Sequence, residues 1–200
     1  MGGRADPAVA LDLLARGEVA LKGRMPRSSN ATFLVEVDLE GTTALAVYKP
    51  ERGERPLWDF PPGLYRREIA AYLLSEALGW GIVPPTAPRD GPLGEGSLQL
   101  FVHADFRQHY FTLLEQAEHR EALQRICLFD LVVNNADRKS GHCLWVPDDR
   151  IYAIDHGLTF HVESKLRTVI WDFGEEPIAP ALLEDVRRVL DALPRALVDL

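Results

Sequence analysis

Cysteine is scarce in this sequence. The only two cysteines, Cys127 and Cys143, do not form a CxxC pair, so no disulfide framework or zinc ribbon is indicated. His156 and His161 follow Cys143 along the chain, but their spacing matches no zinc pattern. Reduced cysteines fit a reducing compartment, and we therefore expect a cytoplasmic location.

Long apolar runs and an excess of positive charge are also lacking. The most apolar stretch, residues 126–133, is interrupted by Asp130 and is far too short to span a bilayer. The N-terminal residues contain no continuous apolar segment of signal-peptide length. The formal net charge of -8 gives no bulk attraction for phosphate backbones or anionic lipids. We expect no integral membrane segment and no nucleic-acid partner.

The apolar residues that are present predict a mixture of helices and strands. Alternation of apolar and polar residues predicts a hairpin over 31–50, with its turn at Glu40 and Gly41. Helical spacing and the usual start and stop residues predict helices over 7–16, from 66 to Gly79, over 109–133, and after Pro180 with a break at Pro194. Further strands are expected around a glycine-rich turn at 90–96, and in a second hairpin with its turn at 147–149.

The order of these parts is that of the protein-kinase-like phosphotransferases. A hairpin that carries Lys49 precedes a helix with Glu68, and a long helix then leads to Asp137, a short hairpin and Asp155. In that chemistry a strand lysine binds nucleotide phosphates, a helix glutamate holds the lysine, one aspartate orients the acceptor, and another binds metal.

Five segments carry a more specific resemblance. The sequence resembles type II phosphatidylinositol 4-kinases and bacterial proteins related to PI3/4-kinases in VYKP, REIAAYLLSEALGWGIVP, GSLQLFV, NNADRKSGHCLW and AIDHGLTF. This resemblance implies an α+β, two-lobed protein-kinase-like fold. The expected N-lobe is an antiparallel sheet with one helix, over residues 1–102. The expected C-lobe, over 103–200, is mainly helical and contains the catalytic hairpin.

The resemblance assigns roles to two charged residues of the expected N-lobe. Lys49 would meet the α- and β-phosphates of ATP, and Glu68 would fix its ammonium group. A solvated lysine at a strand end and an exposed helix glutamate are the alternatives for these residue types.

Asp137, Arg138 and Lys139 are the candidate catalytic residues. Asp137 would orient the acceptor hydroxyl, since a loose phosphoryl transition state depends mainly on positioning and on charge stabilisation. Arg138 would bridge acids or phosphate, and Lys139 would neutralise charge on the γ-phosphate. The alternatives are a turn aspartate that accepts backbone N–H groups and two solvated loop cations.

Asp155 and His142 are the candidate metal ligands. Asp155 precedes a glycine at the end of a strand and takes the place of the metal-binding aspartate in the resemblance. His142 stands five residues after Asp137, where kinases usually carry an asparagine. Oxygen ligands suit Mg²⁺, whereas imidazole suits softer ions such as Mn²⁺, so both ions remain candidates.

Two further segments complete the expected ATP site. No GxGxxG motif precedes Lys49, so Ser28, Ser29 and Asn30 are the candidates to present amides and hydroxyls to phosphate, with a plain polar turn as the alternative. The residues that resemble the adenine-binding hinge between lobes are Gln99, Leu100, Phe101 and Val102, and an ordinary buried strand is their alternative.

These features favour an ATP-dependent phosphotransferase that acts on a hydroxyl of a protein, a small molecule or a lipid. The loop between Lys49 and Glu68 has no cysteine and so lacks the palmitoylated insertion of the lipid kinases. Two alternatives remain: a pseudokinase that binds nucleotide as a scaffold, suggested by His142, and a kinase-like nucleotidyltransferase.

Overall fold

The computed structural model describes residues 6–26, 28–147 and 150–200, which divide into two compact units. Unit 1 comprises residues 1–69 and 84–102, and unit 2 comprises 70–83 and 103–200. The expected N-lobe, residues 1–102, also includes 70–83, which lie in unit 2 of the structure. These residues join unit 2 because they bond to its second hairpin: the N–H of Ala153 donates to the carbonyl of Ile82 over 2.7 Å.

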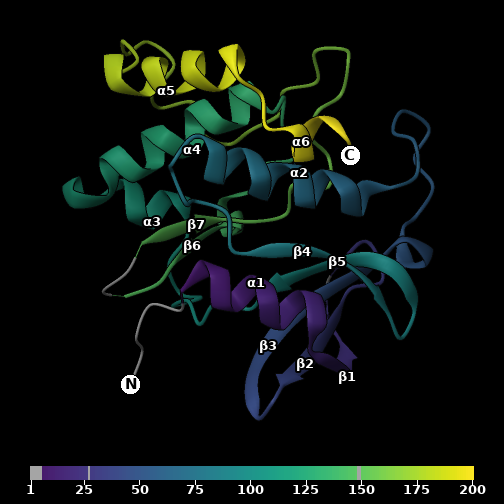
Figure 1. The fold of residues 1–200 in the computed structure, drawn as a ribbon. Coiled ribbons are helices and arrows are strands. Elements are labelled where there is room, and N and C mark those ends of the chain that lie inside the picture. The colour runs from purple at the N-terminus through teal and green to yellow at the C-terminus, as the bar shows by residue number, and fades with distance from the viewer. Residues whose placement is uncertain (1–5, 27, 148–149) are drawn as a thin grey trace. The chain divides into compact units, whose positions relative to one another are not determined.

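Unit 1 is built on a five-stranded antiparallel sheet (Figure 1). The strand order is β1-β2-β3-β5-β4. The strands are β1 (Glu18–Arg24), β2 (Phe33–Leu39), β3 (Thr42–Pro50), β4 (Thr86–Gly91) and β5 (Gly94–Leu100). The third strand is therefore central and pairs on both sides, which holds its side chains in a fixed register.

The first strand was not expected from the sequence. Most of its residues are exposed, so it lacks the alternation that marks a half-buried strand. The predicted turn between β2 and β3 is present, and Glu40 and Gly41 both have positive φ, at 53° and 82°. Such a two-residue turn matches the twist of the paired strands.

Helix α1 (Pro7–Arg16) covers one face of this sheet. Asp6 caps the helix by accepting the N–H of Ala8, and Pro7 occupies the first turn, where its missing N–H costs no hydrogen bond. Leu13 and Leu14 pack with apolar residues of β2, β3, β4 and β5. A short 3₁₀ turn, η1 (Glu51–Gly53), follows β3, and the first residues of α2 (Leu64–Ala77) also belong to unit 1.

Unit 2 contains the remaining helices and a small hairpin. Its other elements are α3 (Tyr110–Leu114), η2 (Ala117–His119), α4 (Arg120–Val132), η3 (Ser140–His142), β6 (Cys143–Trp145), β7 (Ile151–Ala153), α5 (Pro180–Asp191) and α6 (Arg195–Val198). The expected single helix over 109–133 is two helices, because Gln116 adopts an extended conformation between them. The expected break at Pro194 separates α5 from α6.

The hairpin of β6 and β7 lies between the two candidate acids in the sequence, as expected. Residues 148 and 149 of its predicted turn lie outside the described part of the chain. Among the described helices, none combines the length and the apolar character that a bilayer crossing requires.

Candidate active site

Lys49 and Glu68 form an ion pair in unit 1. Lys49 lies near the end of the central strand β3, opposite Ser97 of β5, and Glu68 lies on α2. The Glu68 side chain is only 3% exposed and that of Lys49 is 22% exposed. A buried carboxylate needs a compensating charge, so this pair fixes the lysine ammonium at one place. The roles of both residues toward ATP remain predictions.

Ser28, Ser29 and Asn30 lie in a turn before β2 in which two side chains already have partners. Ser28 shares a hydrogen bond of 2.8 Å with the Thr32 hydroxyl, and Asn30 Oδ1 accepts the N–H of Arg55 at 3.0 Å. These bonds order the turn. Its predicted contact with phosphate would therefore use the hydroxyl and amide groups outside these bonds.

Residues 99–102 lie at the end of β5 and just beyond it. Gln99 is buried and donates from Nε2 to the Thr86 hydroxyl at 2.9 Å. The N–H groups of Leu100 and Phe101 donate to the carbonyls of Pro85 and Leu45. An adenine bound here, as the resemblance predicts, would have to use other backbone groups and apolar contact, including that of Val102.

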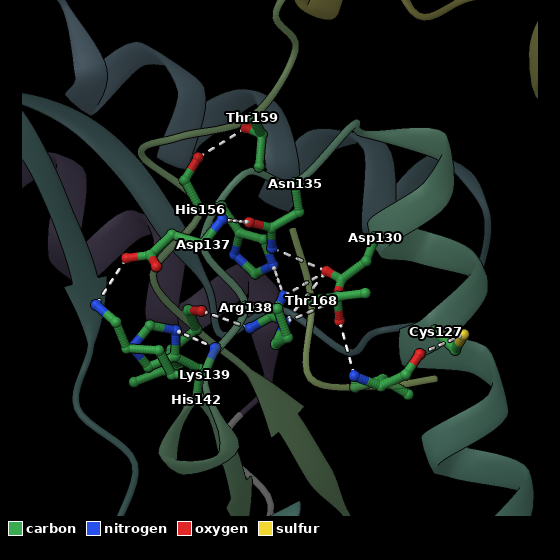
Figure 2. Close-up of polar contacts among 12 residues, drawn as sticks. Cys127, Asp130, Asn135, Asp137, Arg138, Lys139, His142, His156, Thr159 and Thr168 are labelled. Atoms are coloured by element: carbon green, nitrogen blue, oxygen red, sulfur yellow. Dashed lines mark hydrogen bonds and ion pairs between the residues drawn. The ribbon is translucent and has the colours of Figure 1, made fainter. Parts of the chain in front are cut away.

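A buried polar cluster in unit 2 surrounds Arg138 (Figure 2). Arg138 donates from Nε and Nη2 to both oxygens of Asp130 on α4, at 2.8–3.2 Å. It also donates to the carbonyl of Ile154 and to Nε2 of His156. Because a guanidinium cannot accept a hydrogen bond, the His156 ring must be neutral, with its hydrogen on Nδ1. Burial alone would lower the pKa of Arg138, but the charge and hydrogen bonds of Asp130 raise it overall.

This cluster positions the loop that carries Asp137. Asn135 donates from Nδ2 to Asp130 at 2.9 Å, and its Oδ1 accepts the backbone N–H of Asp137 at 3.0 Å. Thr168 adds a longer contact of 3.4 Å to Asp130. Arg138 therefore bridges an acid, as one reading of the sequence expected, but the acid is internal, and the Arg138 side chain is 0% exposed.

Asp137 lies at the edge of this cluster, where its carboxylate meets two cations. Lys139 Nζ is 2.6 Å from Oδ2, and Arg167 Nη2 is 3.0 Å from Oδ1. The Asp137 side chain is 24% exposed, whereas those of Lys139 and Arg167 are 60% and 76% exposed. The carboxylate is therefore partly open to solvent and lies between two positive charges.

The two candidate metal ligands also meet in unit 2. His142 Nε2 lies 3.4 Å from Asp155 Oδ2. Burial lowers the pKa of His142 to about 4, although the charge of Asp155 opposes the shift, so the ring is neutral near pH 7. Asp155 has a φ of 63°, a left-handed conformation that non-glycine residues seldom adopt. Within the described residues, no group of three or more His, Cys, Asp and Glu side chains is arranged to hold a metal.

Sequence reasoning missed Asp130 and Thr168 as parts of the site. Asp130 did leave a signal, because an acid within an otherwise apolar helical run is rarely buried without a partner. For Arg167, in the segment after the second hairpin, the sequence left two readings open: a cation that binds an anionic group, and a solvated cation. Its contact with Asp137 depends on the path of the chain after β7, which no local pattern indicates.

Comparison with known proteins identifies the fold and the family. No family model matches the sequence. Protein Rv2133c of Mycobacterium tuberculosis (strain ATCC 25618 / H37Rv) is 42% identical over 215 residues, which cover 90% of this chain and 77% of that protein.

Two solved structures are similar in fold, both of the Golgi casein kinase. The form with manganese and ADP bound has a TM-score of 0.65 at 15% identity and covers 96% of this chain and 68% of its own. A second crystal structure of that kinase has a TM-score of 0.60 at 15% identity and covers 98% of this chain and 67% of its own. The fold is therefore protein-kinase-like and of the α+β class, and the chain belongs to the family of the mycobacterial protein Rv2133c.

Proposed function

We propose that this protein is an ATP-dependent phosphotransferase that transfers the γ-phosphoryl group to a hydroxyl. The ion pair between Lys49 on β3 and Glu68 on α2 carries this proposal. In kinases the corresponding pair must be formed before the lysine can bind nucleotide phosphates. The protein-kinase-like fold supports the proposal, because it is the fold in which such a pair has this use.

In this proposal Asp137 accepts a hydrogen bond from the acceptor hydroxyl and holds it in line for transfer. Its position is fixed through Asn135 and Asp130 rather than by exposed side chains. Lys139 lies beside Asp137 and would stabilise negative charge on the transferred group. Positioning and charge stabilisation are the terms on which this reaction mainly depends.

Asp155 and His142 would hold the divalent ion. One carboxylate and one neutral imidazole are a suitable pair for an ion that takes its other ligands from phosphate and water. Bound there, Mg²⁺ or Mn²⁺ would neutralise the charge of the phosphates. The imidazole favours Mn²⁺, and the structural neighbour with manganese and ADP is consistent with that choice.

The finer assignment in this proposal is to the PI3/4-kinase-like type, acting in the cytoplasm. The type comes from the sequence segments around Lys49, Asp137 and Asp155, and the location from the two cysteines, which form no disulfide framework. The acceptor in this assignment is a protein, a small molecule or a lipid.

The first test is a calorimetric titration of ATP into the full chain with Mg²⁺ and then with Mn²⁺. Metal-dependent binding is expected, and Asp155→Asn should abolish its metal dependence. Lys49→Met should weaken binding at least tenfold by removing a charge-assisted contact to phosphate. Asp199→Asn is the matched control. Asp199 is also an exposed acid, and its carboxylate forms a long ion pair, of 3.5 Å, with Arg195. Equal binding by all variants would contradict the proposed site.

A second test separates the classes of reaction. Incubation with ATP labelled at the γ-phosphate should move the label to water or to an acceptor, and Asp137→Asn should stop this. Transfer of label from the α-phosphate would instead indicate nucleotidyl transfer. Nucleotide binding with no release from either position would indicate a scaffold.

A further inference from the structure

The segment after the second hairpin is fastened to the loop that carries Asp137. The N–H of Arg167 donates to the carbonyl of Asn135 at 2.8 Å, and the N–H of Arg138 donates to the carbonyl of Arg167 at 3.0 Å. The N–H of Val169 then donates to the carbonyl of Arg138 at 3.2 Å. These backbone bonds set the position of Arg167 whatever its side chain does.

The Arg167 side chain extends from this fixed backbone across the candidate catalytic acid. Nε donates to the carbonyl of Ala136 at 3.0 Å, and Nη2 donates to Asp137 Oδ1 at 3.0 Å. These bonds use two of the five N–H groups of the guanidinium. The side chain is 76% exposed, so the rest of its charged face meets solvent.

Charge balance alone does not explain Arg167. Lys139 already pairs with Asp137 through the other carboxylate oxygen, at 2.6 Å. Asp137 thus carries one negative charge and pairs with two cations, so it does not need both of them for charge balance. A planar guanidinium with free N–H groups is the side chain best suited to binding phosphate or carboxylate in a two-point contact.

We propose that Arg167 binds an anionic group of the acceptor, a phosphate or a carboxylate that lies a few bonds from the reacting hydroxyl. That this anion belongs to the acceptor rests on the proposed phosphotransferase function, whereas the anion site itself does not. The acceptor is then a small hydroxyl compound with a negative charge, and neutral alcohols are poor ligands.

The test uses three small hydroxyl compounds with the same three-carbon skeleton: neutral glycerol, glycerol phosphate, which carries a phosphate, and glycerate, which carries a carboxylate. Each is titrated into the full chain, without nucleotide, while binding is followed by changes in the NMR spectrum. The variants are Arg167→Gln, Arg107→Gln and Lys49→Met. Arg107 is the matched control, because it is also exposed and forms an ion pair of 2.7 Å with an aspartate, Asp105.

We expect at least one of the two anions to bind more tightly than glycerol. Arg167→Gln should weaken its binding about tenfold, as for the loss of one charge-assisted contact, while Arg107→Gln should have no effect. Preference for glycerol phosphate alone would identify a phosphate site, and equal binding of glycerate would extend the site to carboxylates.

Three results would overturn the proposal. The first is that neither anion binds more tightly than glycerol. The second is that the preference for an anion survives in Arg167→Gln. The third is that this preference is lost only in Lys49→Met, which would place the anion at the site of the nucleotide phosphates. A separate titration with ATP and Mn²⁺ tests the proposed function, so that each proposal can fail without affecting the test of the other.

Discussion

Asp137 and Arg138 are neighbours in the chain, and each forms an ion pair, but the two pairs lie in opposite surroundings. Arg138 and Asp130 are almost completely removed from solvent, with side chains 0% and 1% exposed. Asp137 pairs with Lys139 and Arg167, whose side chains are mostly exposed. Arg138 is therefore built into the interior, whereas Asp137, the residue before it, is partly exposed.

The difference shows how a loop can be both rigid and accessible. A buried ion pair contributes little net stability relative to an apolar core, but removal of one partner is costly, so the pair tolerates only one arrangement. An exposed pair is weak and can be exchanged for a pair with a ligand. In this loop the first kind of pair holds the backbone, and the second kind remains available for chemistry.

The buried pair gives the largest expected effect. Asp130→Ala should lower the free energy of unfolding by about 3–5 kcal/mol, because it leaves the Arg138 charge buried without its carboxylate. Denaturant unfolding measures this loss. The double variant Asp130→Leu with Arg138→Met should lose much less than the sum of its single variants. A loss below about 1 kcal/mol in Asp130→Ala would show that the two surroundings do not differ as described.

The link between the two pairs should give an intermediate effect. Asn135→Ala removes the bond to Asp130 and the bond to the N–H of Asp137, and the expected loss is about 1–3 kcal/mol. Denaturant unfolding again provides the measurement. If unfolding is unchanged but release of labelled γ-phosphate falls, Asn135 positions Asp137 without holding the fold together.

The exposed pairs should give the smallest effect on stability. Arg167→Gln and Lys139→Gln are each expected to change the free energy of unfolding by no more than about 0.5 kcal/mol, and less at high salt. Their unfolding curves should nearly overlay that of the unaltered protein. A loss of 2 kcal/mol or more in Arg167→Gln would mean that this side chain holds the fold, and would weaken its assignment to a ligand.

Local patterns in the sequence were enough to predict much of unit 1. The hairpin of β2 and β3 shows alternation and a turn with glycine, and these place Lys49 at a strand end. The strand β1 gave no such signal, because an edge strand with mostly exposed residues has no face to bury. The break between α3 and α4 was missed for a related reason, since the apolar spacing continues across Gln116.

Less of the candidate site in unit 2 could be predicted. The motif around Asp137 identified the loop, but not the opposite burial of Asp137 and Arg138, which depends on Asp130 lying beneath the loop. Similarly, the spacing of Lys139 and Arg167 along the chain does not show that both reach one carboxylate. Such contacts depend on the path of loops. Loops lack the periodic spacing of apolar residues from which helices and strands are predicted.

The left-handed backbone of Asp155 bears on how this protein would respond to selection in the laboratory. Glycine adopts a φ of 63° freely, which would relieve about 1–2 kcal/mol of steric cost against about 0.4–1 kcal/mol for the extra freedom of the unfolded chain. A screen for thermal resistance alone would therefore accept glycine at position 155 if the contacts of the Asp155 carboxylate, including that with His142, contribute less than this difference. Retention of the acid in an evolved library would show that these contacts, or a selective pressure other than folding, outweigh the cost of the backbone conformation.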